Sequence, residues 1–391
     1  MALNEQSDGT RMSDEKQAFL LDRPDFLRQV VGRFIQELLE TEMAEFLQAG
    51  PYERTTVRRG YRSGHRPRTL KTRLGRLELA VPTERSGRFR TRVFAHYQRS
   101  EQAFLLTLQE MYLQGVSTRR VRAITERLCG TQVSASTVSR ATKRLDKDLE
   151  QWRSRRLVEA YPYLIVDARY ERVRQNGRIT SRGVLLIVGV SESGQRDIIG
   201  VTMANTESET SWTEVFRDLV RRGLTGVRLV ISDNHEGLVA AIRRCFQGAE
   251  WQRCQKHFLS NVLSMVNKKD RKVLWQALRT VFDAASLKHA EDRLAEVVVE
   301  WRDRCLELAD KLEAETSDTL AFFHFPSEHW TRIRTTNMLE RYNGELRRRT
   351  RVIRVFPNTA SCLRLVSAHA MEQAAEWAAQ DQYLDMSLLD T

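Results

Sequence analysis

The chain has 391 residues, with 63 Lys and Arg against 51 Asp and Glu and a formal net charge of +12. This length allows two or three domains with at least one sizeable core, and the basic surplus favours a polyanionic partner, most often nucleic acid. The five cysteines are scattered, which argues against a disulfide framework. The N-terminus is polar, unlike a signal peptide, and the longest apolar run, Val184 to Val190, is too short to span a membrane. We therefore expect a cytoplasmic protein.

The chain opens with two segments of different character. Residues 1–22 are polar and predict a disordered N-terminus. In residues 23–50 apolar side chains recur at helical spacing, and Gly50-Pro51 ends the pattern. We predict one helix there, whose apolar stripe forms either a dimer interface or a packing face within its own chain.

The basic surplus is concentrated in residues 51–100, which hold 14 Arg or Lys and 3 Glu, a net charge of +11. Within this region Leu70, Thr72 and Leu74 alternate with polar residues, and Gly75-Arg76 is placed to turn the chain. This pattern predicts a β-hairpin. Such a density of positive charge is typical of a surface that contacts DNA phosphates.

Residues 101–150 contain two short helical patterns separated by Gly130. Ser117 and Ser134 are suited to cap the two helices. The predicted inward-facing residues are Val121, Ile124, Leu128, Val138, Ala141 and Leu145. This arrangement predicts a helix-turn-helix whose second helix presents Arg140, Lys143 and Arg144 to DNA, with an ordinary antiparallel helix pair as the alternative.

Residues 158–257 change to alternating strands and helices. Two acidic residues come directly after apolar strands: Asp167 after Tyr163–Val166, and Asp233 after Val227–Ser232. Open α/β sheets place their sites at the carboxyl ends of strands. Both aspartates are therefore candidate metal ligands, although an Asp at this position can also cap the following loop or helix.

Residues 258–330 are almost purely helical, and residues 331–391 contain the charged sequence TTNMLERYNGELRRRTR at positions 335–351. Thr336 or Asn337 can cap a helix there, which places Glu340 in its first turns, and Arg347 and Arg348 follow on or near the same face. A carboxylate beside arginines suits a metal next to a phosphate backbone. A solvated charged helix is the alternative.

These carboxylates together suit two-metal phosphoryl transfer, in which two ions activate the attacking oxygen and stabilise the leaving oxygen. Mg²⁺ prefers oxygen ligands and retains several waters, so that a few carboxylates suffice. Cys254 and His257 form a C-x-x-H pair, but a structural zinc site needs four ligands. A local packing or hydrogen-bonding role is therefore the first expectation for this pair, with zinc binding as the alternative.

Five motifs, in this order, make the chain similar to a known family. They are TLKTRLGRLELAVP, YLIVDARYERVR, ISDNHEGLVAAI, WQRCQKHFLSNV and TTNMLERYNGELRRRTRVIRVFPN. The chain resembles the bacterial insertion-sequence transposases of the Mutator-like family from about Phe26 to Tyr383.

The resemblance implies an α/β fold with an RNase H-like catalytic core, in residues 158–257 and 331–391, interrupted by an all-α insertion in residues 258–330. It implies a DDE triad of Asp167, Asp233 and Glu340, the last chosen over Glu345 by its place in the T-N-x-x-E-R-x-N motif. The family's C-x-x-H pair falls on Cys254 and His257, as support for the active site. Two Mg²⁺ ions, which Mn²⁺ could replace, are the implied cofactors.

The implied function is that of a DNA transposase that binds the terminal inverted repeats of an insertion sequence, cleaves a strand and transfers it to target DNA. Arg347, Arg348 and Arg349 are candidate backbone contacts beside the triad. Since two ends must be brought together, we expect at least a homodimer, associated with the nucleoid. The alternatives are an RNase H-like nuclease and a non-catalytic helix-turn-helix regulator.

Overall fold

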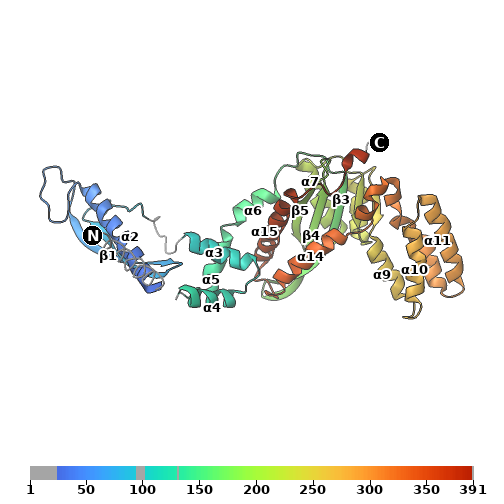
Figure 1. The fold of residues 1–391 in the computed structure, drawn as a ribbon, viewed down its shortest axis with the longest axis horizontal. Helices are drawn as coiled ribbons and strands as arrows, with labels where there is room; N and C mark the ends of the chain where they lie inside the picture. Colours follow the sequence, from blue (N-terminus) through green and yellow to red (C-terminus); the bar gives the residue numbers. More distant parts are fainter. Residues whose placement is uncertain (1–23, 94–101, 130–131, 390–391) are drawn as a thin grey trace, which may run out of the picture. The chain divides into compact units, whose positions relative to one another are not determined.

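The computed structural model describes residues 24–93, 102–129 and 132–389, and the chain forms two compact units, the first ending at Arg144 and the second beginning at Leu145 (Figure 1). The predicted disordered N-terminus, residues 1–22, lies outside the described residues. Among the helices in the described ranges, none is both long and apolar enough to cross a membrane. The division after Arg144 differs from the predicted grouping of residues 101–150.

The first unit begins with a helix packed on a two-stranded hairpin. These elements are α2 (Pro24–Leu47), β1 (Arg62–Thr72) and β2 (Gly75–Glu84). Their shared core contains Leu39, Leu70, Leu77, Leu79 and Val81. The predicted helix and hairpin are confirmed, and α2 packs its buried stripe within its own chain.

The turn of this hairpin lies two residues earlier than predicted. Thr72 pairs with Gly75, so that Arg73 and Leu74 form the turn instead of Gly75-Arg76. Gly75 has a φ of +113°, a conformation that side chains disfavour. The Thr72 hydroxyl fixes the turn by donating to the Gly75 carbonyl at 2.8 Å.

Three helices complete the first unit: α3 (Gln102–Leu113), α4 (Thr118–Cys129) and α5 (Ala135–Lys143). The predicted caps are present, since Ser117 Oγ accepts from Arg120 N at 3.3 Å and Ser134 Oγ accepts from Thr137 N at 3.2 Å. The inward position predicted for Leu128 is wrong. Leu128 is 72% exposed, and the buried stripe of α4 consists of Val121 and Thr125, one helical turn apart.

The second unit contains a five-stranded sheet in the order β5-β4-β3-β6-β7. The strands are β3 (Tyr163–Gln175), β4 (Arg178–Val190), β5 (Arg196–Ala204), β6 (Leu229–Ser232) and β7 (Glu250–Arg253). β4 runs antiparallel to both of its neighbours, whereas β3, β6 and β7 are parallel to one another. The predicted mixed sheet is therefore present.

The first strand of this sheet is far longer than predicted. It continues past Val166 to Gln175, because its polar second half pairs with the first half of β4. Asn176 and Gly177 connect the two strands with φ angles of +49° and +78°, which is the backbone of a tight hairpin turn that favours Asn-Gly. Asp167 consequently lies inside β3 and does not end it.

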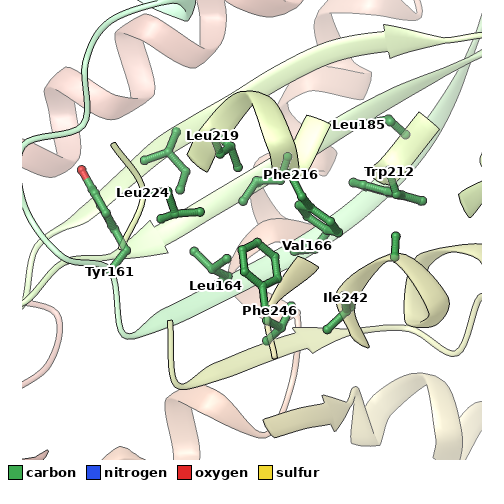
Figure 2. Close-up of a cluster of buried hydrophobic side chains, with 14 of the residues drawn as sticks. Tyr161, Leu164, Val166, Leu185, Trp212, Phe216, Leu219, Leu224, Ile242 and Phe246 are labelled. Carbon is green, nitrogen blue, oxygen red and sulfur yellow. The ribbon is translucent and has the colours of Figure 1, made fainter. Parts of the chain in front are cut away.

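Helices cover both faces of the sheet. On one face α7 (Glu209–Arg221) and α8 (Glu236–Cys245) bury the main core, in which Trp212 and Phe216 stack over Leu164 and Val166 (Figure 2). The other face is covered by α6 (Asp146–Arg153), α14 (Asn337–Thr350) and α15 (Thr359–Ala378). Because side chains alternate along a strand, Asp167 points to this second face.

The helical insertion and the link to α14 follow β7. They comprise α9 (Gln255–Ser264), α10 (Arg271–Phe282), α11 (Leu287–Arg302), α12 (Leu306–Glu315) and α13 (Trp330–Ile333). The predicted helical insertion is present, and Cys305 stands at the start of α12.

Gly237, in the first turn of α8, lies where a side chain would strike the start of α7. A Cβ there would be 2.6 Å from Glu209 N and 2.9 Å from Ser208 C. We expect Gly237→Ala to destabilise the fold by about 1–3 kcal/mol in urea unfolding, because two backbones must separate. Gly344→Ala is the control, since no neighbouring atom lies within 4 Å of its Cβ and alanine favours a helix by about 0.5–1 kcal/mol. Equal effects of the two changes would contradict the close packing.

Candidate active site

Asp167 lies in the middle of β3 and is held by two hydrogen bonds. Its Oδ1 accepts from Ala168 N at 2.9 Å, and its Oδ2 accepts from Asn343 Nδ2 of α14 at 2.7 Å. Asn343 is itself only 9% exposed. The carboxylate is therefore oriented before any ligand arrives.

Asp233 follows β6 directly, as predicted, and β6 is the parallel neighbour of β3. The register pairs Ile165 with Ile231, so that two residues further along each strand lie Asp167 and Asp233. Asp233 Oδ1 is buried and accepts no hydrogen bond within the described part of the chain. Two carboxylates thus meet at the same edge of the sheet, as the sequence predicts.

Burial, together with the neighbouring charge of Asp233, raises the pKa of Asp167 to about 6. The charge of His257 and the two hydrogen bonds oppose this rise. A carboxyl group with such a pKa lacks sufficient positive charge around it. The site therefore favours the arrival of cations.

Glu340 lies in the first turn of α14 and faces α9. Its Oε1 is 3.4 Å from His257 Nε2, and its Oε2 forms an ion pair with Lys256. Oε1 is also buried without a hydrogen-bond donor among the described residues. Since Glu340 and Asn343 are three residues apart, they share one face of α14, and this face closes over Asp167.

Cys254 is buried between β7 and α9 and binds the start of α14. Its sulfur accepts from Thr336 N at 3.4 Å and from Thr336 Oγ1 at 3.3 Å. Burial alone would raise the pKa of the Cys254 thiol, but interactions with His257 and Thr336 outweigh it and lower that pKa. The cysteine therefore joins three elements of the site at one point.

The sulfur of Cys254 raises the pKa of His257 to about 9, and Glu340 and Asp233 contribute in the same direction. His257 Nδ1 is buried without a hydrogen bond of ordinary geometry within the described ranges. Ligand atoms of Cys254, His257 and Glu340 lie within 4.8 Å of one another. This trio supplies three ligand atoms, whereas structural zinc takes four.

Arg169 follows Asp167 by two residues and so projects from the same face of β3. Its Nη1 donates to the carbonyl of Asn343 at 3.0 Å, and its Nη2 contacts Glu171 and Thr350. This buried arginine fixes α14 against β3. Arg169, Lys256 and the Asn343 contact were not predicted from the sequence. For Arg169 a signal exists, because a residue two positions after Asp167 on a strand projects from the same face.

Residues 1–380 match the sequence model of the transposases of the Mutator family. The chain belongs to this family. The transposase for insertion sequence element ISRM5 of Rhizobium meliloti (strain 1021) is 48% identical over 380 residues, 97% of this chain and 96% of that protein. The transposase for IS406 of Burkholderia multivorans is 44% identical, over 90% and 92% of the two chains. The transposase for IS256 in transposon Tn4001 of Staphylococcus aureus is 39% identical, over 91% and 92%. The resemblance predicted from the motifs is confirmed.

The predicted DNA contacts of this Mutator-family chain occupy two kinds of environment. Arg140, Lys143 and Arg144 are exposed at the end of α5 in the first unit, and Arg347 and Arg348 are exposed on α14. Arg349 differs, because its side chain is only 12% exposed and lies 3.7 Å from Glu372 of α15. That contact packs α14 against α15, so Arg349 has little surface left for DNA.

The raised pKa of Asp167 predicts that ionisation of this carboxyl lowers the free energy of unfolding of the metal-free protein. A carboxyl whose pKa is higher in the folded than in the unfolded state loses stability as the pH rises from about 4 through 6. In EDTA we expect Asp167→Asn to stabilise the fold by up to about 3 kcal/mol at pH 7.5, and by less at pH 5. Urea unfolding at both pH values measures this difference. Asp292→Asn, on the exposed surface of α11, controls for the removal of one charge, and a pH-independent effect of Asp167→Asn would contradict the prediction.

Proposed function

We propose that the protein is a DNA transposase that binds the terminal inverted repeats of an insertion sequence and catalyses metal-dependent strand cleavage and strand transfer. The observation that carries this proposal is the convergence of Asp167, Asp233 and Glu340 from β3, β6 and α14. Family membership and the names of the relatives, which are insertion-sequence transposases, support the same conclusion.

The topology of the second unit supports an RNase H-like core. Its first three strands form an antiparallel meander, and β6 and β7 extend the sheet on the other side of β3 in parallel. Helices α9 to α12 lie in the chain between Asp233 and Glu340, which is where the resemblance implies an insertion. The first two carboxylates then come from neighbouring central strands, and the third comes from a helix that follows the insertion.

The three carboxylates fit Mg²⁺, since hard oxygen ligands are what this ion prefers. Asp233 Oδ1 and Glu340 Oε1 are buried oxygens with no hydrogen-bond donor in the described structure, and the pKa of Asp167 is raised by burial and by the neighbouring Asp233. Asp167, Asp233 and Glu340 would hold two such ions. When bound, the ions would activate the attacking oxygen and stabilise the leaving oxygen of the phosphodiester.

The chain's own residues prepare this site in distinct ways. Asn343 donates to Oδ2 of Asp167 and so fixes the orientation of this carboxylate. His257, with a pKa of about 9, carries a positive charge near neutral pH that offsets the three carboxylates. Lys256 pairs with Glu340 from an exposed position, so its ammonium is free to move to a DNA phosphate when Glu340 takes another partner.

The first unit supplies the surfaces for recognition of the inverted repeats. β1 is basic and largely exposed, and α5 presents Arg140, Lys143 and Arg144 beyond a capped N-terminus. On α2, an apolar stripe of Val30, Phe34 and Leu38 is 39–60% exposed. Four-residue spacing places these side chains on one face, which suits the homodimer that pairing of two ends requires.

Replacing each carboxylate tests the triad. We expect Asp167→Asn, Asp233→Asn and Glu340→Gln each to reduce Mg²⁺-dependent cleavage by at least about 1000-fold while DNA binding is retained, because charge stabilisation of the reacting phosphate is lost. The assay uses a labelled fragment with the flanking inverted repeat, and resolves nicked ends from joined products. Glu345→Gln is the matched control, since Glu345 lies on the same helix but is exposed and paired with Arg348.

The products separate the alternatives. A nicked end followed by a joined product supports a transposase, whereas a nick without joining indicates a nuclease. Binding without either product indicates a regulator. Cleavage that survives Asp167→Asn would refute the triad, and equal loss with Glu345→Gln would show that any charge change on α14 suffices.

A further inference from the structure

A second, basic pocket lies on the face of α14 that points away from the carboxylates. It is a cavity of about 230 Å³ lined by three arginines, Arg196, Arg332 and Arg341, together with Tyr383 and Trp377. The arginines come from β5, α13 and α14, elements far apart in the sequence. Neither the family description nor the sequence motifs assign a role to this pocket.

The guanidinium groups are held in place by aromatic rings. The Cζ of Arg196 lies 4.8 Å from the ring centre of Trp377 and 4.5 Å from that of Tyr383. The Cζ of Arg332 lies 5.0 Å from the Tyr383 ring centre. Tyr383 therefore contacts two cations, and stacking restricts the rotation of both side chains. Binding of a ligand to these two arginine side chains would therefore cost little conformational entropy.

The positive charge in this pocket is not compensated. Arg196 donates to the amide oxygen of Gln380 at 2.7 Å, and within the described residues none of the three arginines forms an ion pair. The carboxylate that lines the pocket, Glu345, already accepts from Arg348 at 3.1 Å. Three guanidinium groups thus face one cavity with one shared carboxylate, which is the environment of an anion site.

We propose that this pocket binds a phosphate of the DNA backbone, as a contact separate from the phosphate that is cleaved. The proposal rests on the proposed function, which supplies DNA as the polyanion. A cavity of this size admits one phosphate group, and planar guanidinium forks match its oxygens. The contact is sequence-independent, because nothing in it reads a base edge.

The helical period separates the two sites on α14. Asn337, Arg341 and Glu345 lie at four-residue spacing and line the basic pocket, whereas Glu340 and Asn343 face the carboxylates. At about 100° per residue, Arg341 and Asn343 point about 160° apart. A helix with its side chains is about 10–12 Å wide, so the two sites take different phosphates of one DNA.

The test measures the salt dependence of DNA binding with the full chain in the Asp167→Asn background. Each phosphate contact contributes about 0.9 to the slope of log affinity against log salt concentration. Because the pocket holds one phosphate, we expect Arg332→Gln/Arg341→Gln to lower this slope by about 0.9, so that between about 50 and 200 mM salt it loses roughly three- to fourfold less affinity than the parent. Fluorescence anisotropy with an inverted-repeat duplex and with an unrelated duplex of equal length should give the same change.

Three further variants decide whether charge is responsible. Arg221→Gln/Arg304→Gln removes two exposed arginines that are ion-paired elsewhere and should leave the slope unchanged. Arg332→Lys/Arg341→Lys should retain the slope of the parent, because the charge is kept. Arg341→Gln alone should lower the slope in the same direction by a smaller amount, and since Arg341 is exposed, this variant avoids disturbing the Tyr383 stack.

The outcomes are distinguishable. If the unmodified chain cleaves DNA and the Asp167→Asn parent binds it, but the glutamine variants keep the slope of the parent, the phosphate site is refuted and the proposed function stands. If the lysine variants lose the slope as the glutamine variants do, packing and not charge is responsible, and the phosphate site is again refuted. If the parent binds neither duplex, the proposed function fails, and the phosphate site fails with it.

Discussion

The parallel pairing of β3 with β6 is the constraint on which the second unit depends. Three consecutive residue pairs, ending at Ile165 and Ile231, fix the register. The same register brings Asp167 and Asp233 to one edge of the sheet, where neither can leave without breaking a central pair of strands. The core on the other face of the sheet, around Trp212 and Phe216, is a cluster of hydrophobic side chains. Compensation must come from above the sheet.

His257 of α9 supplies positive charge and Asn343 of α14 donates a hydrogen bond to Asp167. The position of α14 is set by ties to three neighbours. Thr336 binds Cys254 beside α9, Asn343 binds Asp167 on β3, and Arg349 lies against Glu372 of α15. Thr336 stands at the N-cap position, yet its hydroxyl donates to the Cys254 sulfur and makes no cap hydrogen bond. A cap is worth about 1 kcal/mol, so this helix gives up local stability for a tertiary contact that places Glu340.

The sequence predicts those parts of the fold and site that depend on local pattern. The strand before Asp233 is short, apolar and ends where predicted, and the capping serines of α4 and α5 are used. The extension of β3 past Asp167 is missed, because its residues 168–175 are polar and gain their structure from pairing with β4. The signal for it is Asn176-Gly177, which marks a two-residue hairpin turn.

The contacts between distant residues could not be derived from local pattern. The hydrogen bond from Asn343 to Asp167 joins residues 176 apart, and Thr336 and Cys254 are 82 apart. Nothing in either segment indicates its partner, since a Thr at a helix start is equally suited to capping and an Asn within a helix is equally suited to contact solvent. The choice of Glu340 over Glu345 has the same origin: both are acidic residues of one charged helix, and the T-N-x-x-E-R-x-N motif separates them where periodicity does not.

Glu340 and Arg341 of α14 lie on different faces of the helix, and each face has a different environment. Its sequence is consistent with a solvated helix, but Glu340 faces a histidine and a lysine, and Arg341 faces a cavity with two further arginines. Adjacent residues point about 100° apart on a helix, so the acidic Glu340 and the basic Arg341 that follows it lie in different environments. An acidic face that attracts cations and a basic face that attracts phosphates are what a helix beside a DNA strand requires. Uniform charge on α14 would satisfy one of these demands and repel the other ligand.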